Sequence, residues 1–519
     1  MTTGRGNTGV GNVVGGAGMS SQRALPEQSW TAGQIVRRWW AFYNEKTSTR
    51  ALTKIEFAEH IAYLLFLKID HERTNRPGKF AVRPVAPSAD TWPRLVEHSG
   101  EALHAYFAGT MQTLGTPEPD NQRRTLASVL FHDAQPWNID RMSELRQLIT
   151  EEIAPYRWSQ IPDIELGRAF AQLLSDCYDD MLKKRETGQF LTPLPLLAAV
   201  AKALALTPDD RVIDPAGGIG STLIAAHREM ASYGTRVDDA AIAGADIDPQ
   251  MCRLATINVL LNTKRLFAGM PPMLRTDSLS RKGRAIHRQD PDVVATVAIC
   301  NPPFKSTDAA VDTTHRDDFW APKADLPTNF LQHIAITLPR EARAAVFVPD
   351  SVLFSRGAAA TIRRNLLNLC DVHTLLRLPT GIFRGTNSKA NILFFNTSTP
   401  RPTGEPATRT LWVYDARTGN HRADTVNPLT EDDLADFLAA YRPGDPGRTT
   451  RTPSVRFKPY NVTELLARPD VNLELWADVA EVSDDLAPPR DIAAAIVAEL
   501  NSASMSFQAV VDSFDPRHS

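Results

Sequence analysis

Cysteine is scarce in this chain, and long apolar runs and signal-like segments are missing. Only four cysteines occur in 519 residues, with no CxxC pair, so neither a zinc signature nor a disulfide framework is present. Scattered single cysteines suit the reducing cytoplasm, which is the predicted location, and no metal site is expected. The longest apolar stretches, such as residues 61–67, are too short to span a bilayer. The N-terminus lacks the apolar core of a signal peptide.

An excess of positive charge is also absent. The chain has 57 Lys and Arg against 60 Asp and Glu, a formal net charge of −3. A protein that binds nucleic acid alone usually carries a basic excess or a basic face. If nucleic acid is the substrate, basic residues must be concentrated locally, or a partner must supply much of the binding surface.

The chain is long enough for two or three domains, and its composition changes along its length. Residues 1–28 are rich in Gly, Ser and Thr and are predicted to be a disordered tail. In residues 29–160 apolar side chains recur every three or four positions, which predicts a helical N-terminal domain. Residues 161–400 alternate strands with helices, and residues 401–519 form an extension ending in helices. The fold class is therefore α/β.

The α/β region is predicted to contain a mainly parallel sheet with helices on both faces. Strands are expected at residues 211–213, 241–245, 293–300, 344–348, 374–378 and 391–395. A helix is expected over residues 221–230, and another begins at Pro249, where Asp248 serves as the N-cap.

Asn301-Pro302-Pro303-Phe304 directly follows one predicted strand. Ligands of open parallel sheets bind beyond the carboxyl ends of the strands, where this tetrapeptide would lie. The prolines would fix the directions of the Asn301 side chain and the Pro302 carbonyl. Two acceptors on one exocyclic amine leave its nitrogen free to attack an electrophilic methyl group. Phe304 would stack on an extruded base. The alternative is a rigid turn that merely ends a strand.

Residues 214–220 read DPAGGIG and form a glycine-rich turn between a predicted strand and a helix. Glycines let a ligand approach the backbone closely. A dinucleotide-binding GxGxxG starting at Gly218 would need glycine where the chain has Leu223, and the P-loop lysine is missing. A ligand without a pyrophosphate remains, and S-adenosylmethionine fits. The candidate binding residues are Asp214, Gly218, Ile219, Gly220 and Ser221.

Two acidic residues follow this turn. Asp246 comes directly after a predicted strand, where a carboxylate would bind ribose hydroxyls. The alternative is that Asp246 belongs with Asp248 to the cap of the following helix. Asp277 would accept a hydrogen bond from the adenine amine of the cofactor, although by itself it is typical of an exposed turn.

Other segments are less specific. Residues 187–193 read TGQFLTP, and spacing alone indicates only a loop before a helix. Its candidate cofactor contacts are Gln189, Phe190, Leu191, Thr192 and Pro193. The basic residues within 281–288 would either contact phosphates or form a solvated face. The polar stretch 305–328 follows the tetrapeptide directly and is long enough to be a functional loop.

The combination resembles the modification subunits of type I restriction-modification systems, which are gamma-ordered amino-methyltransferases. Segment 187–193 resembles the family's upstream cofactor segment, 214–220 its methionine-binding turn, and 301–304 its catalytic tetrapeptide. Asp246 stands where the family usually has Glu. Residues 327–334, 348–354, 378–383 and 413–418 are also similar to family segments. The resemblance covers residues 30–515.

The resemblance implies a Rossmann-like methyltransferase sheet and transfer of a methyl group from S-adenosylmethionine to N6 of adenine in double-stranded DNA. It implies catalytic roles for Asn301, Pro302, Pro303 and Phe304. It also implies two such chains paired with one specificity subunit, docked through the C-terminal helices, and leaves room for a restriction subunit. A partner that reads the DNA would explain the negative net charge.

Two other functions stay open at this point. Methyltransferases of RNA bases and of protein glutamine also use Asn-Pro-Pro loops, but segment 187–193 and the large helical domain argue against them. A non-catalytic scaffold with a methyltransferase fold is disfavoured because the tetrapeptide is intact.

Overall fold

The computed structural model describes most of the chain from Trp30 to Leu475. The described residues are 30–46, 52–75, 84–116, 125–184, 191–263, 271–285, 294–304, 311–383, 389–398, 404–417 and 428–475. The predicted tail 1–28, the candidate residues Gln189 and Phe190, and the predicted C-terminal helices all lie outside them.

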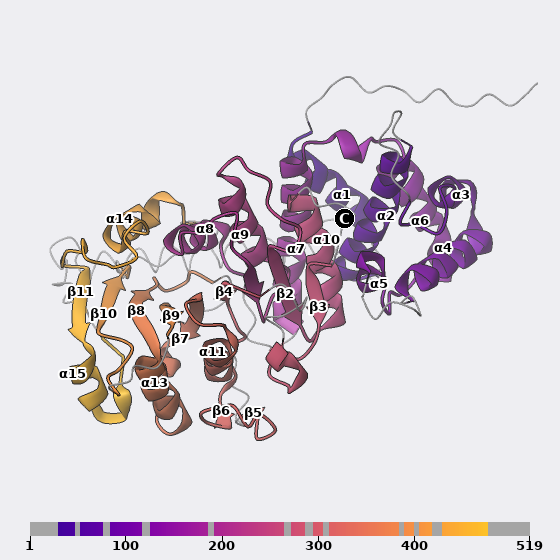
Figure 1. Cartoon of the computed structure of the whole chain (residues 1–519). Helices are drawn as coiled ribbons and strands as arrows, with labels where there is room; N and C mark the ends of the chain where they lie inside the picture. The colour runs from indigo at the N-terminus through magenta and orange to yellow at the C-terminus, as the bar shows by residue number, and fades with distance from the viewer. Residues whose placement is uncertain are drawn as a thin grey trace, which may run out of the picture.

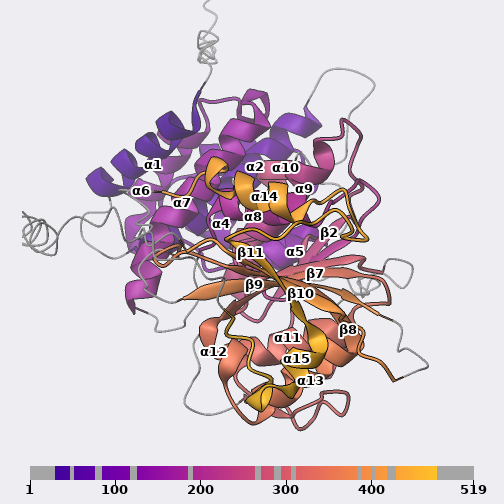
Figure 2. The ribbon, with the colours of Figure 1, turned by 90° about the vertical axis from the view of Figure 1, so that its left-hand side faces the viewer.

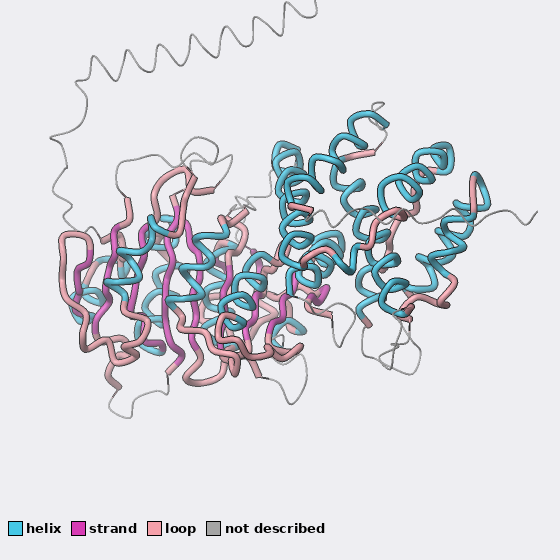
Figure 3. Tube along the Cα trace, turned by 90° about the horizontal axis from the view of Figure 1, so that it is seen from above, coloured by secondary structure: helices cyan, strands magenta, loops and turns pink. Residues whose placement is uncertain are grey.

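The structure has a helical part and a part built on a sheet, which lie side by side (Figure 1). The helical part contains α1 Ala32–Lys46, α2 Lys54–Thr74, α3 Thr91–Glu97, α4 Gly100–Gly115, α5 Leu126–Leu130, α6 Met142–Gln147 and α7 Asp163–Lys184. Seen from above, the strands gather at one end of the molecule and the other end is helical (Figure 3). The predicted helical N-terminal region is confirmed.

The central helix of this part is α2, whose start is set by its own sequence. The Thr53 side chain accepts from the Glu56 N–H, and the Glu56 carboxylate accepts from the Thr53 N–H, which is a complete capping box. Every residue from Phe57 to Asp70 is buried. A helix that is buried on all sides serves as the core around which its neighbours pack.

The sheet has nine strands in the order β11-β10-β8-β9-β7-β4-β1-β2-β3. These are β1 Val212–Asp214, β2 Ile242–Asp246, β3 Met273–Arg275, β4 Val297–Cys300, β7 Arg343–Pro349, β8 Cys370–Arg377, β9 Ala390–Thr397, β10 Thr410–Asp415 and β11 Phe457–Asn461. A separate pair is formed by β5 Val311–Asp312 and β6 Lys323–Ala324. The sheet continues past residue 400 through β10 and β11, which the sequence did not predict.

Helices cover both faces of the sheet, as predicted. They are α8 Leu194–Ala203, α9 Ser221–Ala231, α10 Pro249–Thr263, α11 Leu326–Thr337, α12 Asp350–Phe354, α13 Ala358–Leu369, α14 Ala435–Tyr441 and α15 Val462–Ala467. Figure 2 shows α8, α9 and α14 on one side and α11, α12, α13 and α15 on the other. None of the helices in the described part of the chain is long and apolar enough to cross a membrane.

The sheet is mainly parallel, as predicted, because the pairings among β3, β2, β1, β4 and β7 and the pairing of β10 with β8 are all parallel. Strand β9 runs antiparallel to both of its neighbours, β7 and β8. The connection from β8 to β9 contains Pro379 and Gly381, which disfavour a helix. Antiparallel neighbours need no crossover connection, whereas parallel neighbours need one, which is usually a helix. Strand β11 also pairs antiparallel with β10.

Helix α10 joins the two parts of the molecule. Its Leu254 and Ile257 belong to the apolar core of the helical part, whereas Ala255 and Val259 belong to a core of the sheet. Because α10 is buried on almost every side, it can pack against both cores at once. The helical part is therefore packed directly on the helix that follows Asp246.

A buried ion pair strengthens this junction. Arg253 on α10 donates from Nε to Glu59 Oε1 on α2 at 2.9 Å, and Gln250 Nε2 donates to Glu59 Oε2 at 3.0 Å. Arg253 Nη1 also donates to the His132 carbonyl at 2.9 Å. Both side chains of the ion pair are 9% exposed. Such a charge is tolerated inside a protein only while its partner is present.

Replacing Glu59 by alanine is expected to lower the free energy of unfolding by about 3–5 kcal/mol, because Arg253 would stay buried without a counter-charge. Urea denaturation followed by tryptophan fluorescence measures the loss. The matched control is Glu431→Ala, which breaks the exposed Lys202–Glu431 pair of 2.9 Å. That change should cost at most about 1 kcal/mol. Equal losses in the two variants would contradict a stabilising role for the junction.

Candidate active site

The candidate residues meet at one edge of the sheet. Strands β3, β2, β1 and β4 are parallel, so their carboxyl ends lie together. Asp214 and Asp246 are the last residues of β1 and β2, and Asn301 follows the last residue of β4. Asp277 lies two residues beyond β3. The edge on which ligands of such sheets bind thus carries most of the candidates that the structure describes.

The glycine-rich turn after β1 is closed on one side and open on the other. Gly218 and Gly220 have φ values of +50° and +80°, a conformation that favours glycine. A Cβ on Gly220 would lie 2.7 Å from Val259 Cγ2, whereas one on Gly218 would meet nothing within 4 Å. Asn258 Nδ2 donates to the Ile219 carbonyl at 2.8 Å. Helix α10 therefore holds the turn, and space is left at Gly218.

Asp214 also holds the glycine-rich turn, through hydrogen bonds of its carboxylate. Its carboxylate is 1% exposed and accepts from the Ala216 N–H at 2.9 Å and from the Thr222 hydroxyl. Burial raises the pKa of Asp214 to about 6. With both oxygens engaged inside the protein, Asp214 shapes the turn. Ser221, the first residue of α9, is half-buried beside it.

Asp246 connects the turn with the start of α10. One oxygen accepts from the Gly218 N–H at 3.1 Å, and the other accepts from the Asp248 N–H at 2.9 Å. Burial raises the pKa of Asp246 to about 6. Asp248 instead accepts from the Gln250 N–H at 2.8 Å in the first turn of α10. Asp248 is therefore the capping residue, and Asp246 faces the turn as the main prediction requires.

Asn301 contacts the segment upstream of α8. Its Nδ2 donates to Thr192 Oγ1 at 2.8 Å, across 109 residues of sequence. Pro193 directly precedes α8, and Leu191 packs on the core of the helical part. Segment 191–193 thus lies between the helical part and the tetrapeptide. Thr192, predicted as a cofactor contact, is positioned to orient the Asn301 amide.

The rest of the tetrapeptide is largely covered. Pro302 is buried and Pro303 half-buried. The Phe304 ring is 9% exposed, and its centroid lies 5.7 Å from that of Phe383 with the rings nearly perpendicular. A base stacked on Phe304 would have to displace part of this cover, so the stacking role stays a prediction.

Asp277 follows β3, whereas Asn301 follows β4, so the two residues lie at opposite ends of this row of strand ends. Its side chain is exposed and accepts from the Leu279 N–H at 2.9 Å. The next residue, Ser278, donates from Oγ to the Pro215 carbonyl at 2.6 Å. The turn that carries Asp277 is therefore attached to the glycine-rich turn.

The chain is similar to known methylases in sequence and in fold. Residues 163–451 match the family model described as N-6 DNA Methylase. The chain is 30% identical over 416 residues to the methylase subunit of the type I restriction enzyme StySPI of Salmonella potsdam, covering 76% of this chain and 74% of that protein. It is 31% identical over 407 residues to the StySJI methylase subunit of Salmonella typhimurium, covering 74% and 72%.

The chain belongs to the N-6 DNA methylase family. The resemblance to type I modification subunits is thereby confirmed. The fold of this methylase is also that of a modification subunit of a putative type I restriction enzyme from Vibrio vulnificus YJ016. The TM-score is 0.63 at 22% identity, covering 84% of this chain and 92% of that one.

Sequence patterns did not single out one further candidate at the ligand-binding edge. Ile247 directly follows Asp246 and is 66% exposed, so its apolar side chain is accessible beside that carboxylate. Exposed apolar surface at such a position suits a flat ligand. An isoleucine between two aspartates, in the sequence Asp-Ile-Asp, was the available signal.

The structure also explains two family-like segments of the methylase. Asp350, at the end of β7, pairs with Arg377 at the end of β8 at 3.2 Å, and Asn391 Nδ2 donates to Asp350 at 2.8 Å. Arg377 Nη1 also donates to the Leu475 carbonyl at 3.0 Å. Segment 348–354 thus contacts Arg377, which directly precedes segment 378–383, next to the last described residue.

Proposed function

We propose that this methylase transfers a methyl group from S-adenosylmethionine to N6 of adenine in DNA, as the modification subunit of a type I restriction-modification complex. The observation that carries the proposal is the position of Asn301. It lies beyond the carboxyl end of β4, with its amide held by Thr192, on the same edge as Asp246 and the open side of Gly218.

The described residues fit the cofactor. The space beside Gly218 would admit a ligand close to the backbone. The Asp246 carboxylate is buried at a pKa of about 6, so hydroxyl donors would stabilise its charged form. Ile247 offers apolar surface for the adenine ring, and Asp277 an acceptor for its amine. Ser221 and segment 189–193 complete the proposed binding set, of which the structure describes residues 191–193.

S-adenosylmethionine, when bound, supplies an electrophilic methyl group. The chain's own residues hold the amine that receives it. Asn301 Oδ1 and the Pro302 carbonyl would each accept one N6 hydrogen of the target adenine, which keeps the nitrogen lone pair out of the ring. Thr192 fixes the Asn301 amide through Nδ2. Catalysis would rest on positioning and fixed dipoles, and the surplus proton of the amine would leave to water.

The target adenine would be extruded from double-stranded DNA into this site and stacked on Phe304. Arg281 and Lys282 are exposed near the same edge and would contact phosphates. With a net charge of −3, most recognition of the DNA would fall to a specificity subunit. We propose that two of these chains assemble with one such subunit, and that a restriction subunit can join the complex.

The experiment is nucleoside mass spectrometry on DNA from cells that express this chain together with a specificity subunit. N6-methyladenine is expected in these cells and not in cells that lack the chain. Methylated RNA or protein in place of DNA would identify another planar amine as the substrate. A soluble complex that methylates none of the three would instead support a scaffold.

A further inference from the structure

A segment after the catalytic tetrapeptide is built into the fold. This post-catalytic segment, residues 311–325, forms the β5–β6 pair, and the Thr313 N–H donates to the Pro322 carbonyl at 2.9 Å. Two fully buried amides of α11 hold it. Gln332 bonds both the N–H and the carbonyl of Ala321, at 3.2 and 2.8 Å, and Asn329 Nδ2 donates to the Ala324 carbonyl at 2.8 Å.

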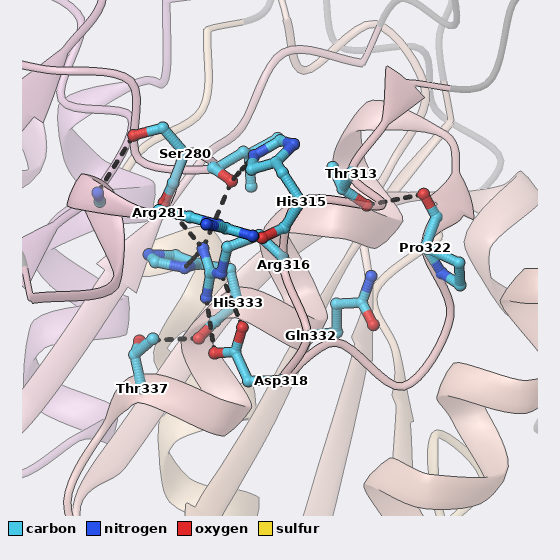
Figure 4. Close-up of polar contacts among 12 residues, drawn as sticks. Ser280, Arg281, Thr313, His315, Arg316, Asp318, Pro322, Gln332, His333 and Thr337 are labelled. Carbon is cyan, nitrogen blue, oxygen red and sulfur yellow. Dashed lines mark hydrogen bonds and ion pairs between the residues drawn. The ribbon is translucent and has the colours of Figure 1, made fainter.

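Arg316 is the central residue of this segment (Figure 4). It is 2% exposed, and its Nε and Nη2 bind the two oxygens of Asp318 at 2.8 and 2.9 Å. Its Nη1 lies 3.3 Å from His333 Nδ1. The guanidinium also lies 4.1 Å from the centroid of the Phe319 ring. A charge this deeply buried is accommodated because nearly every N–H meets an acceptor.

The same guanidinium reaches the cofactor side of the site. Its Nη1 lies within hydrogen-bonding range of three successive carbonyls, those of residues 278, 279 and 280, at 3.4, 3.4 and 3.3 Å. These residues follow Asp277, and we name residues 277–281 the cofactor-side turn. A second hydrogen bond joins the same two segments with the donor on the cofactor-side turn: Arg281 Nε donates to the His315 carbonyl of the post-catalytic segment at 2.8 Å.

The contacts form a continuous connection. The post-catalytic segment binds the cofactor-side turn through Arg316, and the turn binds the glycine-rich turn through the hydrogen bond from Ser278 to the Pro215 carbonyl. Arg316 also contacts His333 on α11. The buried guanidinium of Arg316 therefore lies between the post-catalytic segment, which follows the tetrapeptide, and the cofactor-side turn.

We propose that Arg316 is a positioning residue for the cofactor site. It holds the cofactor-side turn, and with it Asp277 and Pro215, at the distance from the sheet that the cofactor needs. Because this inference rests on the proposed function, the wild-type protein must bind the cofactor product for it to be tested. Lysine cannot replace arginine here, since one ammonium cannot bind Asp318 and the row of carbonyls together.

The test compares Arg316→Lys with Arg451→Lys by calorimetric titration with S-adenosylhomocysteine. Arg451 is a matched control because it is 7% exposed and donates to the Tyr441 carbonyl at 2.9 Å and to Thr374 Oγ1 at 3.0 Å. It contacts β8, which β9 and β7 separate from β4. We expect Kd to rise about tenfold or more in Arg316→Lys and to stay within about twofold in Arg451→Lys.

An unchanged Kd in Arg316→Lys would overturn the proposal, and so would an equal rise in Arg451→Lys, because the loss would then report general loosening. Absence of binding by the wild type would contradict the proposed function instead. In the assembled complex, KM for the cofactor should rise with Kd while kcat falls less than about threefold, since Arg316 touches no reacting atom. A fall in kcat at unchanged KM would also overturn the proposal.

Hydrogen exchange on the wild type keeps the proposal testable if Arg316→Lys does not fold. S-adenosylhomocysteine is expected to slow exchange in peptides covering 277–281 and 311–319 together, because Arg316 joins them. Protection of the first peptide alone would overturn a positioning role for Arg316.

Discussion

Replacing Asn301 by alanine is expected to slow methyl transfer by about 10²- to 10³-fold, because the variant loses an acceptor aimed at the reacting amine. The Kd for S-adenosylhomocysteine should change little, since Asn301 is directed at the target base in the proposed mechanism. Transfer of a labelled methyl group to DNA by the complex with a specificity subunit measures the first effect, and calorimetry measures the second.

Replacing Thr192 by valine is expected to slow methyl transfer less than Asn301→Ala does. It keeps the shape of the side chain and removes the hydroxyl that accepts from Asn301 Nδ2 at 2.8 Å. A lost neutral hydrogen bond corresponds to about 1 kcal/mol, so methyl transfer should slow by about fivefold. Asn301→Ala working at the wild-type rate would remove the tetrapeptide from the mechanism. A larger loss in Thr192→Val than in Asn301→Ala would mean that Thr192 acts mainly elsewhere.

Replacing Asp246 by asparagine is expected to weaken cofactor binding more than it weakens the fold. A hydrogen bond to a charged acceptor is worth about 1.5–3 kcal/mol, so Kd should rise about ten- to a hundredfold at pH 8. The folded protein without cofactor should lose only about 1–2 kcal/mol, because Oδ1 of the asparagine can still accept from one of the two N–H groups that bind Asp246, while the other N–H is left facing Nδ2. The two effects separate function from stability at one residue.

The pH dependence follows from the raised pKa of Asp246, which burial moves from its ordinary 3.8 to about 6. The folded protein then holds the proton more tightly than the unfolded chain does. The stability that Asp246 contributes is therefore full below about pH 4 and is lost as the pH rises through 6. Cofactor affinity runs the other way. A protonated carboxyl accepts poorly, so wild-type affinity should fall about tenfold per pH unit below 6.

Calorimetric titrations and thermal unfolding at pH 5 and pH 8 test both statements. The pKa of Asp214 is also raised to about 6, so the difference between wild type and Asp246→Asn isolates Asp246 from its neighbour. The difference in affinity between wild type and variant should be about tenfold smaller at pH 5 than at pH 8. Equal affinities at pH 8 would exclude Asp246 from the cofactor site.

The sequence by itself determined the residues at the carboxyl ends of β1, β2 and β4. Short apolar strands followed by Asp214, Asp246 and Asn301 are local patterns, and local hydrogen bonds produce them, as at the Asp248 cap of α10. The same residues indicated transfer of a methyl group to an exocyclic amine, and the resemblance to a known family implied that the amine is N6 of adenine in DNA. Periodicity likewise predicted the helical part.

The tertiary structure alone decided which distant residues meet. Thr192 is hydrogen-bonded to Asn301, and Glu59 to Arg253. Arg316 contacts the carbonyls of the residues that follow Asp277. The reversed direction of β9 and the strands β10 and β11 were also outside the reach of periodicity. The reason is physical. A buried cation or amide is stable only where several acceptors from separate segments converge, and only the packed core brings those segments together.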